Sequence, residues 1–441
     1  MPAPMRPHYL QSNLYRTRAR FPVVCAGRGS GKTEIMRRKI IRYLSIDRPD
    51  VRAAGDIARY FYGLPTQVQA KRVAWDHLKS LLPLSWYETE RTATSVGRTF
   101  YESERVIRTR FGTELHLVGL DTPQRIEGNQ WCGGVLDECS DQRPRIFNLT
   151  VRPALTAFHG WCARIGVPKR FGIGAEEFKA ACDMAASGID ADCEYYHWKS
   201  ATVVTPEELA RIKATLDIRD YREQYEATWE STSGVIFHAF SDANIDANIT
   251  GPDYDDTNAF LIVGSDFNVN PMSWCLCKRV GNDELHVFDE LSIRNTNTQE
   301  TLKILHERYG HHKGFFQFFG DASSNARKTA AATTDYVQIA NSPLFTRRTI
   351  HYLRSNPSHI NRFASCNARF LSADGKVHVK VHPRCKRLIA DLKHRSYKEH
   401  TREPNDSGDI GHMSDALGYI IYRIWPLRIV EEQDNPVVVH S

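Results

Sequence analysis

The stretch that most constrains the fold is VVCAGRGSGKT at residues 23–33, where an apolar run breaks into a glycine loop. Glycines at 27, 29 and 31 let backbone N–H groups turn inward around an anion, because side chains there would block its approach. Lys32 supplies a positive charge for the β- and γ-phosphates, and Thr33 can ligate Mg²⁺ at the start of a helix. The residues predicted to hold ATP are Gly27, Arg28, Gly29, Ser30, Gly31, Lys32 and Thr33. Ala26 stands where this pattern usually has its first glycine, and a glycine-rich turn before a helix is the simpler alternative.

The length and composition set limits on the rest of the chain. With 441 residues the chain is long enough for two or three domains. No apolar stretch has membrane-spanning length and no signal peptide is visible, so we expect a soluble cytosolic protein. The ten cysteines are scattered and form no paired CxxC framework, which predicts reduced thiols in the core. A net charge of +6 is compatible with a polyanionic partner without identifying one.

Apolar segments alternate with helical patterns through the first half of the chain, which predicts a parallel sheet with helices on both faces. Ligands of such sheets lie at the carboxyl ends of strands, so a second anchor is expected from a strand neighbouring the first. The sequence GGVLDE at 133–138 fits this position. Asp137 would support Mg²⁺ through water and Glu138 would polarise an attacking water. A solvated turn is the alternative for such an acidic pair.

Three further residues or segments carry weaker signals. Arg28 lies in the glycine loop and can reach the γ-phosphate, or it forms a local salt bridge. Gln11 can read an adenine edge, or it is simply an exposed glutamine. The turn at 166–168, around Val167, is a candidate segment for sensing hydrolysis, although an ordinary strand-ending turn is the simpler interpretation.

A charged helical region at 205–229 is followed by a polar, Asp- and Asn-rich stretch that extends to residue 258. A change of this kind is typical of a hinge between domains. We therefore predict one α/β domain at residues 1–231 and a second at residues 232–441.

The second half contains acidic residues at the ends of apolar runs. AFLIVGSD ends in Asp266, GFFQFFGD ends in Asp321, and the helix predicted from GHMSDALGYIIYRIW carries His412 and Asp415 in its first turn. Aspartates on two strands and a helix are suited to holding a pair of Mg²⁺ or Mn²⁺ ions in a phosphodiesterase site. Glu290, after ELHVFD, is a candidate fourth ligand, and the role of His412 stays open. The alternative is that these aspartates only cap turns.

Basic, tyrosine-containing runs at 345–354 and 382–402 lie near these acidic segments in the sequence. Such a surface suits a phosphate backbone, although charge runs are usually solvated faces. The last residues, 431–441, are predicted to form a solvated tail that can dock on a partner.

The order and spacing of these motifs resemble the large subunit of the tailed-bacteriophage DNA-packaging terminase. The resemblance covers nearly the whole chain and rests on AGRGSGKT, GGVLDE, YREQYEATWESTSGVIF, GSDFNVNP, FFGDASSN and GHMSDALGYI. It implies a P-loop ATPase domain followed by a ribonuclease H-like nuclease domain. The family's coupling segment commonly has a hydroxyl residue before its proline, whereas this chain has Val167.

The resemblance also implies roles and partners. Lys32 and Thr33 would bind phosphate and Mg²⁺, Asp137 would support that metal, and Glu138 would activate water. The nuclease metals would be held by Asp266, Asp321 and Asp415. ATP would drive double-stranded DNA through a portal ring into a capsid, with a small terminase subunit and a ring of copies, in the cytoplasm of the infected bacterium, and the nuclease would cut concatemeric DNA.

Two other functions remain open from the sequence. A helicase-nuclease of DNA repair would normally need a larger set of helicase segments with a second arginine-bearing domain. An ATP-binding DNA scaffold without nuclease activity requires that the aspartates of the second half merely cap turns.

Overall fold

The computed structural model describes residues 7–88, 97–230, 234–268, 270–322, 333–398, 401, 403–406, 410–427 and 436–440. The chain divides into two compact units: the first comprises Met1–Leu209 and Arg222–Thr232, and the second Ala210–Tyr221 and Ser233–Ser441. The domain boundary predicted between 231 and 232 lies outside the described residues, so it stays a proposal.

The first unit contains an eight-stranded sheet in the order β3-β4-β5-β2-β6-β7-β1-β8. The strands from β5 to β8 in this order are parallel to one another, whereas β3 and β4 pair antiparallel at one edge. All six residues of β1 are buried, as expected for a parallel strand with helices on both faces. The bounds are β1 (Phe21–Ala26), β2 (Ala58–Leu64), β3 (Phe100–Tyr101), β4 (Val106–Arg108), β5 (Thr113–Gly119), β6 (Gly133–Leu136), β7 (Trp161–Gly166) and β8 (Cys193–Trp198).

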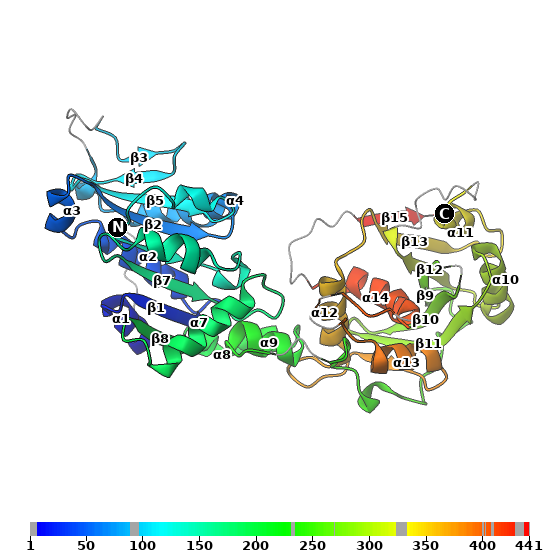
Figure 1. The fold of residues 1–441 in the computed structure, drawn as a ribbon. Helices are drawn as coiled ribbons and strands as arrows, with labels where there is room; N and C mark the ends of the chain where they lie inside the picture. Colours follow the sequence, from blue (N-terminus) through cyan, green and yellow to red (C-terminus); the bar gives the residue numbers. More distant parts are fainter. Residues whose placement is uncertain are drawn as a thin grey trace. The chain divides into compact units, whose positions relative to one another are not determined.

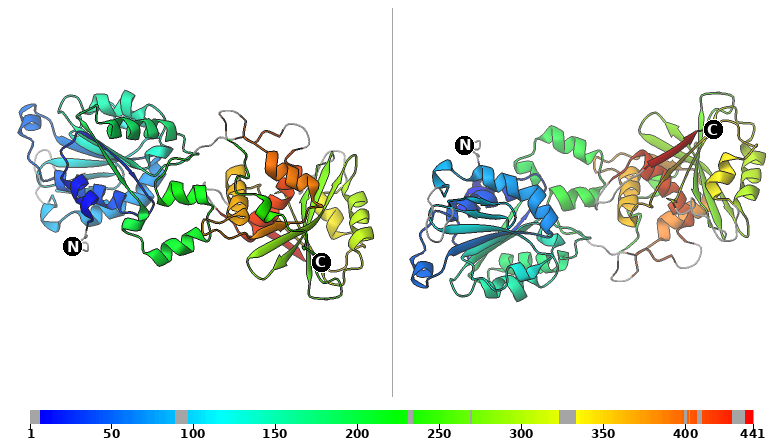
Figure 2. Two further views of the ribbon diagram at one scale, coloured as in Figure 1. Left: turned by 90° about the horizontal axis from the view of Figure 1, so that it is seen from below. Right: turned by 90° about the horizontal axis from the view of Figure 1, so that it is seen from above.

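Two hydrophobic cores cover the two faces of this sheet. One core includes side chains from α1 (Tyr9–Arg16), α2 (Lys32–Tyr43) and α5 (Asp76–Leu81), and the other includes side chains from α7 (Ala175–Ser187). The ribbons of these helices can be followed in Figure 1 and Figure 2. This arrangement confirms the layered α/β architecture that the alternating pattern predicts. The α-helices described before residue 231 are α1 (Tyr9–Arg16), α2 (Lys32–Tyr43), α3 (Pro49–Ala53), α4 (Gln67–Ala70), α5 (Asp76–Leu81), α6 (Arg152–Ala154), α7 (Ala175–Ser187), α8 (Pro206–Lys213) and α9 (Ile218–Tyr225).

The second unit contains a seven-stranded mixed sheet in the order β14-β11-β10-β9-β12-β13-β15. Strands β9, β12 and β13 are parallel, while β10 pairs antiparallel with both β9 and β11. The bounds are β9 (Phe260–Asp266), β10 (Met272–Val280), β11 (Glu284–Ile293), β12 (Phe315–Gly320), β13 (Arg348–Leu353), β14 (Val379–Val381) and β15 (Pro436–His440).

Helices again supply both cores of this sheet. One core contains side chains from α12 (His359–Phe370), α13 (Lys386–His394) and α14 (His412–Ile424), and the other contains side chains from α10 (Thr298–Tyr309) and α11 (Asp335–Ala340). Gly264 lets α14 approach β9 closely, because a Cβ atom at this position would lie 2.4 Å from the Ala416 carbonyl oxygen. Close packing of this kind places the first turn of α14 near the end of β9.

The C-terminal residues differ from the predicted solvated tail. Residues 436–440 form β15, which pairs antiparallel with β13 from Pro436 opposite Leu353 to His440 opposite Thr349. The run VVV favours this strand, and pairing satisfies the open backbone groups along one side of β13. Residues 431–435 and 441 of the predicted tail lie outside the described residues.

The cysteines match the sequence prediction, since all ten are free and nine of them are buried. Among the helices that the structure describes, none has the length and apolar character needed to cross a membrane.

Candidate functional site

The glycine loop joins the end of β1 to the start of α2. Gly29 and Gly31 have φ angles of +70° and +78°, in the left-handed region that favours glycine. At Gly27, a Cβ atom would lie 2.3 Å from the Ser200 Oγ atom. The backbone angles therefore favour glycine at 29 and 31, and the close approach of Ser200 favours it at 27. Ala26 is the last residue of β1 and precedes the loop, so the missing first glycine leaves this geometry intact.

Neighbouring segments hold the loop in place through its backbone. The Arg28 N–H donates to the Gln224 carbonyl at 2.6 Å, and the Ser200 hydroxyl donates to the Arg28 carbonyl at 2.6 Å. The Trp198 indole donates to the Ser30 carbonyl at 3.1 Å. The Ser30 hydroxyl is buried without a hydrogen-bond partner among the described residues. A fixed loop with an unsatisfied buried hydroxyl fits a phosphate ligand.

Gln11 contacts the loop, although not in the way the sequence suggests. Its side chain is only 2% exposed, its amide N–H donates to the Ser30 carbonyl at 2.9 Å, and its amide oxygen accepts from the His8 N–H at 3.2 Å. Both ends of the amide are thus used in supporting the loop from α1. Recognition of an adenine edge by Gln11 stays a prediction.

The acidic pair follows β6 and faces the start of α2. Asp137 is buried; its Oδ1 atom lies 3.5 Å from the Thr33 hydroxyl and its Oδ2 accepts from the Tyr62 hydroxyl at 2.6 Å. Burial, and then the charge of Glu138, raises the pKa of Asp137. The expectation of a neighbouring strand was wrong, since β7 lies between β1 and β6. The first turn of α2 nevertheless brings Thr33 within reach of Asp137.

Lys32 lies close to both acidic residues. It is 6% exposed, and burial lowers its pKa while the charges of Glu138 and Asp137 raise it. Glu138 has the left-handed φ angle of +56°, which is uncommon for a residue with a side chain and typical of functional positions. Its side chain is 38% exposed, so it is accessible to water. Together with Thr33, these residues form the core of a candidate ATP site.

Two more cations lie at this site. The side chain of Arg28 is exposed, and its charge lowers the pKa of Lys32, as does that of Lys169. The ammonium group of Lys169 lies 3.7 Å from the Glu138 carboxylate and also pairs with Asp141. The sequence reasoning missed Lys169, although a basic residue directly after the Gly-Val-Pro turn is a visible signal. The role of Arg28 at the γ-phosphate stays a prediction.

The turn around Val167 is linked to the acidic pair by its backbone. The Ser140 hydroxyl donates to the Val167 carbonyl at 2.5 Å, and Ser140 lies two residues beyond Glu138. A role for this turn in sensing hydrolysis stays a prediction.

The second candidate site lies at one end of the sheet of the second unit. Asp266 ends β9 and Asp321 directly follows β12, and these strands are adjacent and parallel. Asp415 lies in the first turn of α14, which packs on β9. Burial raises the pKa of Asp266, and the negative charges of Asp415 and Asp321 raise it further. The sheet thus brings together the three predicted aspartates from distant parts of the sequence.

Asp415 is held by two arginines whose side chains are almost completely buried. Its Oδ1 atom accepts from Arg362 at 2.7 Å and from Arg395 at 2.6 Å, whereas its Oδ2 has a longer contact of 3.3 Å with Arg395. Burial alone would raise the pKa of Asp415, but the two guanidinium groups lower it overall. One oxygen of this carboxylate is therefore strongly engaged and the other less so.

His412 and Glu290 have different surroundings. The Nδ1 atom of His412 lies 2.9 Å from the Asp266 Oδ2 atom, and this hydrogen bond raises the pKa of His412. The two oxygens of Glu290 accept from the backbone N–H groups of Arg387 and Leu388, both at 2.9 Å. These contacts cap the N-terminus of α13. They do not support Glu290 as a fourth metal ligand, and that assignment stays a prediction.

The three aspartates have the oxygen atoms that a pair of metal ions would need, but the spacing of their side chains does not form a site for an ion. Within the described residues, no three His, Cys, Asp or Glu side chains are close enough together to hold one metal ion. Carboxylate oxygens are nevertheless the ligands that Mg²⁺ and Mn²⁺ prefer, and the charges of Asp415 and Asp321 that raise the pKa of Asp266 would be offset by a cation. Metal ligation by these three aspartates therefore stays a prediction.

Parts of the predicted basic surface are used inside the second unit. Arg395 is buried and pairs with Asp406 and Asp415, and Arg348 donates to the Ser342 carbonyl at 2.9 Å. These cations stabilise the fold, so the exposed basic surface is smaller than the sequence predicts.

The comparisons with known proteins identify the class of fold. No family model matches the chain, and no curated protein matches it in sequence. Solved structures do match over nearly the whole chain, and together with the two α/β sheets described above they confirm the predicted fold class.

The particular structures are those of the large terminase from a thermophilic bacteriophage. One crystal form matches with a TM-score of 0.54 at 12% identity, covering 94% of this chain and 98% of that one. The complexes with ATP-γ-S and with ADP match with TM-scores of 0.54 and 0.52, both at 13% identity with the same coverage. The resemblance predicted from the motifs is thus confirmed at the level of the fold: this chain has the fold of a phage large terminase.

Proposed function

We propose that this protein is a viral genome-packaging motor that hydrolyses ATP to move double-stranded DNA into a procapsid and cuts concatemeric DNA with a metal-dependent nuclease site. The observation that carries the proposal is the presence of two separate sites in one chain. Lys32, Thr33, Asp137 and Glu138 converge around a fixed glycine loop, and three aspartates converge at the ends of β9, β12 and the start of α14.

In the ATPase site, each residue has a distinct task. The loop N–H groups and Lys32 bind the β- and γ-phosphates. Thr33 and Asp137 would hold the Mg²⁺, which would neutralise phosphate charge. Glu138 accepts a proton from the attacking water, the bond between the γ-phosphorus and the bridging oxygen breaks, and ADP and inorganic phosphate leave.

In the nuclease site, Asp266, Asp321 and Asp415 would be the ligands for Mg²⁺ or Mn²⁺. A bound metal pair would activate water and stabilise the leaving oxygen of the phosphodiester. His412 orients Asp266 through their 2.9 Å contact, and Arg362 and Arg395 orient Asp415. Nuclease chemistry of this type needs no ATP, so the ATPase site serves the movement of DNA.

The same proposal includes the partners and the place of action. They are double-stranded DNA, a portal ring, a small terminase subunit and further copies of this chain in a ring, in the cytoplasm of the infected bacterium. The matched structures support this proposal, since they are of a phage large terminase and of its complexes with ADP and ATP-γ-S.

The first test compares plasmid cleavage in Mn²⁺ or Mg²⁺ and ATP hydrolysis for the unaltered chain, Lys32→Ala and Asp266→Ala. Glu307→Ala, an exposed acidic position on α10, is the control. We expect Lys32→Ala to lose ATP hydrolysis and keep cleavage, and Asp266→Ala to lose cleavage and keep ATP hydrolysis. Equal cleavage by all variants would point to a contaminating nuclease and leave an ATP-binding scaffold. Robust unwinding of a short duplex would instead favour a helicase-nuclease.

A further inference from the structure

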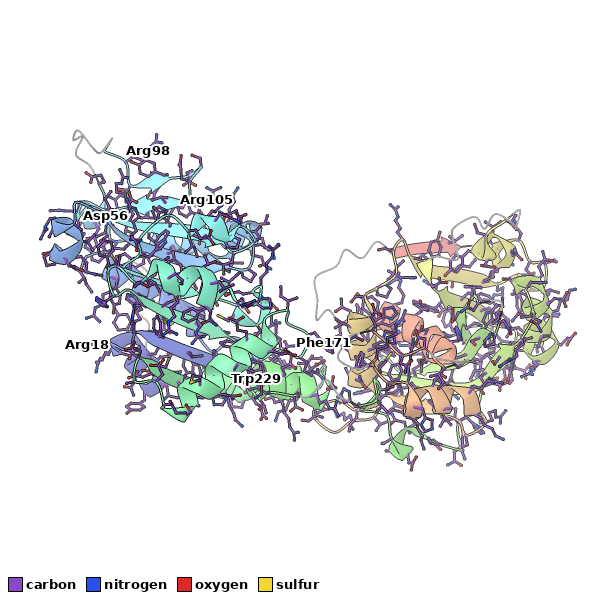
Figure 3. All side chains as sticks on the ribbon, viewed as in Figure 1. Arg18, Asp56, Arg98, Arg105, Phe171 and Trp229 are labelled. Atoms are coloured by element: carbon purple, nitrogen blue, oxygen red, sulfur yellow. The ribbon has the colours of Figure 1, made fainter. Side chains whose placement is uncertain are left out.

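One row of side chains crosses the sheet of the second unit at the end where β9 and β12 begin. Phe260, the first residue of β9, lies beside Phe315, the first residue of β12, and their rings are stacked with centroids 5.5 Å apart and an angle of 26°. The guanidinium carbon of Arg347, which precedes β13, lies 3.9 Å from the centre of the Phe315 ring. The side chains of these strands are drawn as sticks in Figure 3. Two stacked rings thus have a cation on one side.

The other end of this row carries a second arginine. Strand β10 pairs antiparallel with β9, with Cys277 opposite Ile262, and both strands continue beyond this pair. Because side chains alternate along a strand, two residues farther on Arg279 and Phe260 lie side by side on one face of the sheet. The four residues that form this aromatic row are Arg279, Phe260, Phe315 and Arg347.

The aromatic row is open to solvent and positively charged. Phe260 is 44% exposed, and Arg279 is exposed. Within the described residues, no carboxylate pairs with Arg279 or Arg347. The first donates to the Asn282 carbonyl at 2.5 Å and the second to the Lys313 carbonyl at 2.9 Å. Since a guanidinium group has five N–H donors, each arginine keeps donors for an anionic ligand.

Trp425 extends the aromatic surface beside Arg279. It directly follows α14, and the guanidinium carbon of Arg279 lies 5.4 Å from the centre of the indole ring. Arg369 lies over the same ring at 4.7 Å, but its charge is paired with Asp283. The indole ring therefore helps to position Arg279 without neutralising its charge.

Two stacked rings between two guanidinium groups match the chemistry of a single strand of nucleic acid. Unpaired bases stack on exposed aromatic rings, and arginines bind the phosphates between them. A duplex fits less well, because neighbouring base pairs cover the faces of its bases. The aromatic row also lies away from the candidate nuclease site, since Phe260 begins β9 and Asp266 ends it, about 20 Å farther along the strand.

We propose that the aromatic row binds single-stranded DNA, with a base stacked on Phe260 and phosphates held by Arg279 and Arg347. This inference goes beyond the proposed function, whose packaging and cleavage steps act on double-stranded DNA. Only the choice of DNA over RNA rests on that function. Because the row is separate from Asp266, an unpaired end of DNA binds there without occupying the candidate nuclease site.

The first test is the Kd of a labelled oligo-dT of about 16 nucleotides. It is measured by fluorescence anisotropy on the full chain with EDTA, which removes the metal ions that cleavage needs. Phe260→Ala is expected to raise the Kd about tenfold, because the stacking of one base is lost. Phe260→Tyr keeps an aromatic face and is expected to bind as the unaltered chain does. Val337→Ala, at an exposed apolar position on α11, is the matched control and is expected to leave the Kd unchanged.

The salt dependence of the same Kd tests the two arginines. Arg279→Gln and Arg347→Gln are each expected to lower the slope of log Kd against log salt concentration by about 0.7, the value for one phosphate contact of a single strand. Arg308→Gln, at an exposed arginine of α10, is the control and is expected to leave the slope unchanged.

An unchanged Kd in Phe260→Ala, or an unchanged salt slope in both arginine variants, overturns the inference. An equal loss with a duplex of the same length overturns the preference for a single strand, and a loss confined to oligo-U overturns the assignment to DNA. Plasmid cleavage and ATP hydrolysis by the unaltered chain uphold the proposed function in each of these cases. Their absence overturns the proposed function and leaves the binding of oligo-dT to be judged by these variants alone.

Discussion

The two candidate sites are built in different ways. The ATP site comes largely from one continuous stretch, whose glycines have backbone angles and close approaches that a side chain would prevent. The carboxylate site is assembled from β9, β12 and α14. Asp266 on β9 and Asp415 on α14 lie more than 140 residues apart in the sequence. In the first candidate site the loop backbone shapes the place for a ligand. In the second, the packing of separate strands and a helix brings the side chains together.

This difference predicts where each site is vulnerable. A contiguous loop fails when its own conformation is blocked. A site assembled by packing fails when the elements that carry its side chains are pushed apart, even by a change that touches no aspartate.

The largest expected effect comes from adding a methyl group at Gly27 and at Gly264, where neighbouring atoms lie close. A Cβ atom at Gly27 would lie 2.3 Å from Ser200 Oγ, and one at Gly264 would lie 2.4 Å from the Ala416 carbonyl oxygen. Gly27→Ala is expected to lower ATP hydrolysis about 100-fold, and Gly264→Ala to lower DNA cleavage about 100-fold, because displacements of about 1 Å cost that much. Each variant serves as the control of the other. Loss of both activities in either variant would show that the two sites are not built independently.

The next effect concerns the buried arginines of the carboxylate site. Arg395 pairs with Asp406 and Asp415, and Arg395→Met leaves both carboxylates without this partner. Breaking a buried pair costs about 3–5 kcal/mol, which urea unfolding of the full chain measures as a loss in the free energy of unfolding. Lys393→Met, two residues earlier at the exposed end of α13, is expected to cost less than about 0.5 kcal/mol. Equal losses in the two variants would mean that Arg395 does not hold Asp415.

The candidate ATP site could be outlined more completely from the sequence than the candidate carboxylate site, for the same physical reason. A glycine pattern fixes local backbone angles, so residues 27–33 could be assigned directly. Asp266 and Asp321 could be named from strand ends and Asp415 from the start of a helix. The arginine partners of Asp415, Arg362 and Arg395, could not, since only tertiary packing brings those cations to Asp415. The contacts of Glu290 with the N-terminus of α13 could not be predicted either, since they join segments far apart in the sequence.

Strand order shows another limit of the sequence. The pattern indicated parallel strands without their order, so β7 between β1 and β6 could not be foreseen. The final VVV run was predicted to be part of a solvated tail. Its pairing with β13 joins segments far apart in the sequence, so the run alone could not reveal it.

Glu114 in the first unit and His412 in the second are expected to couple stability to pH in opposite directions. In the first unit, Glu114 is buried, which would raise its pKa, but hydrogen bonds from His116 and Arg108 lower the pKa to about 2. The contribution of Glu114 to the free energy of unfolding is present above the usual glutamate pKa. It is lost as the pH falls through the pKa of Glu114 in the folded protein. In the second unit, the Asp266 contact raises the pKa of His412, so its contribution is present below the usual histidine pKa and is lost as the pH rises through the folded value.

Free energies of unfolding of Glu114→Gln and His412→Gln, measured in urea across pH, check these opposite directions. Between about pH 5 and pH 3 the unaltered chain is expected to lose about 1–2 kcal/mol more than Glu114→Gln, after allowance for solvent screening. Between about pH 6 and pH 8 it is expected to lose more stability than His412→Gln. Parallel pH curves for the unaltered chain and either variant would contradict the corresponding contact.

The smallest expected effect tests whether the glycine loop needs support from outside its own stretch. Gln11 donates to the Ser30 carbonyl from α1, and Gln11→Ala removes this hydrogen bond. The loss of one buried hydrogen bond is worth about 1 kcal/mol, so the KM for ATP is expected to rise about fivefold with kcat nearly unchanged. Ser12→Ala, on the same helix, is the control. A large fall in kcat with unchanged KM would mean that Gln11 acts in the transition state, and the contrast between a loop made locally and a site made by packing would then weaken.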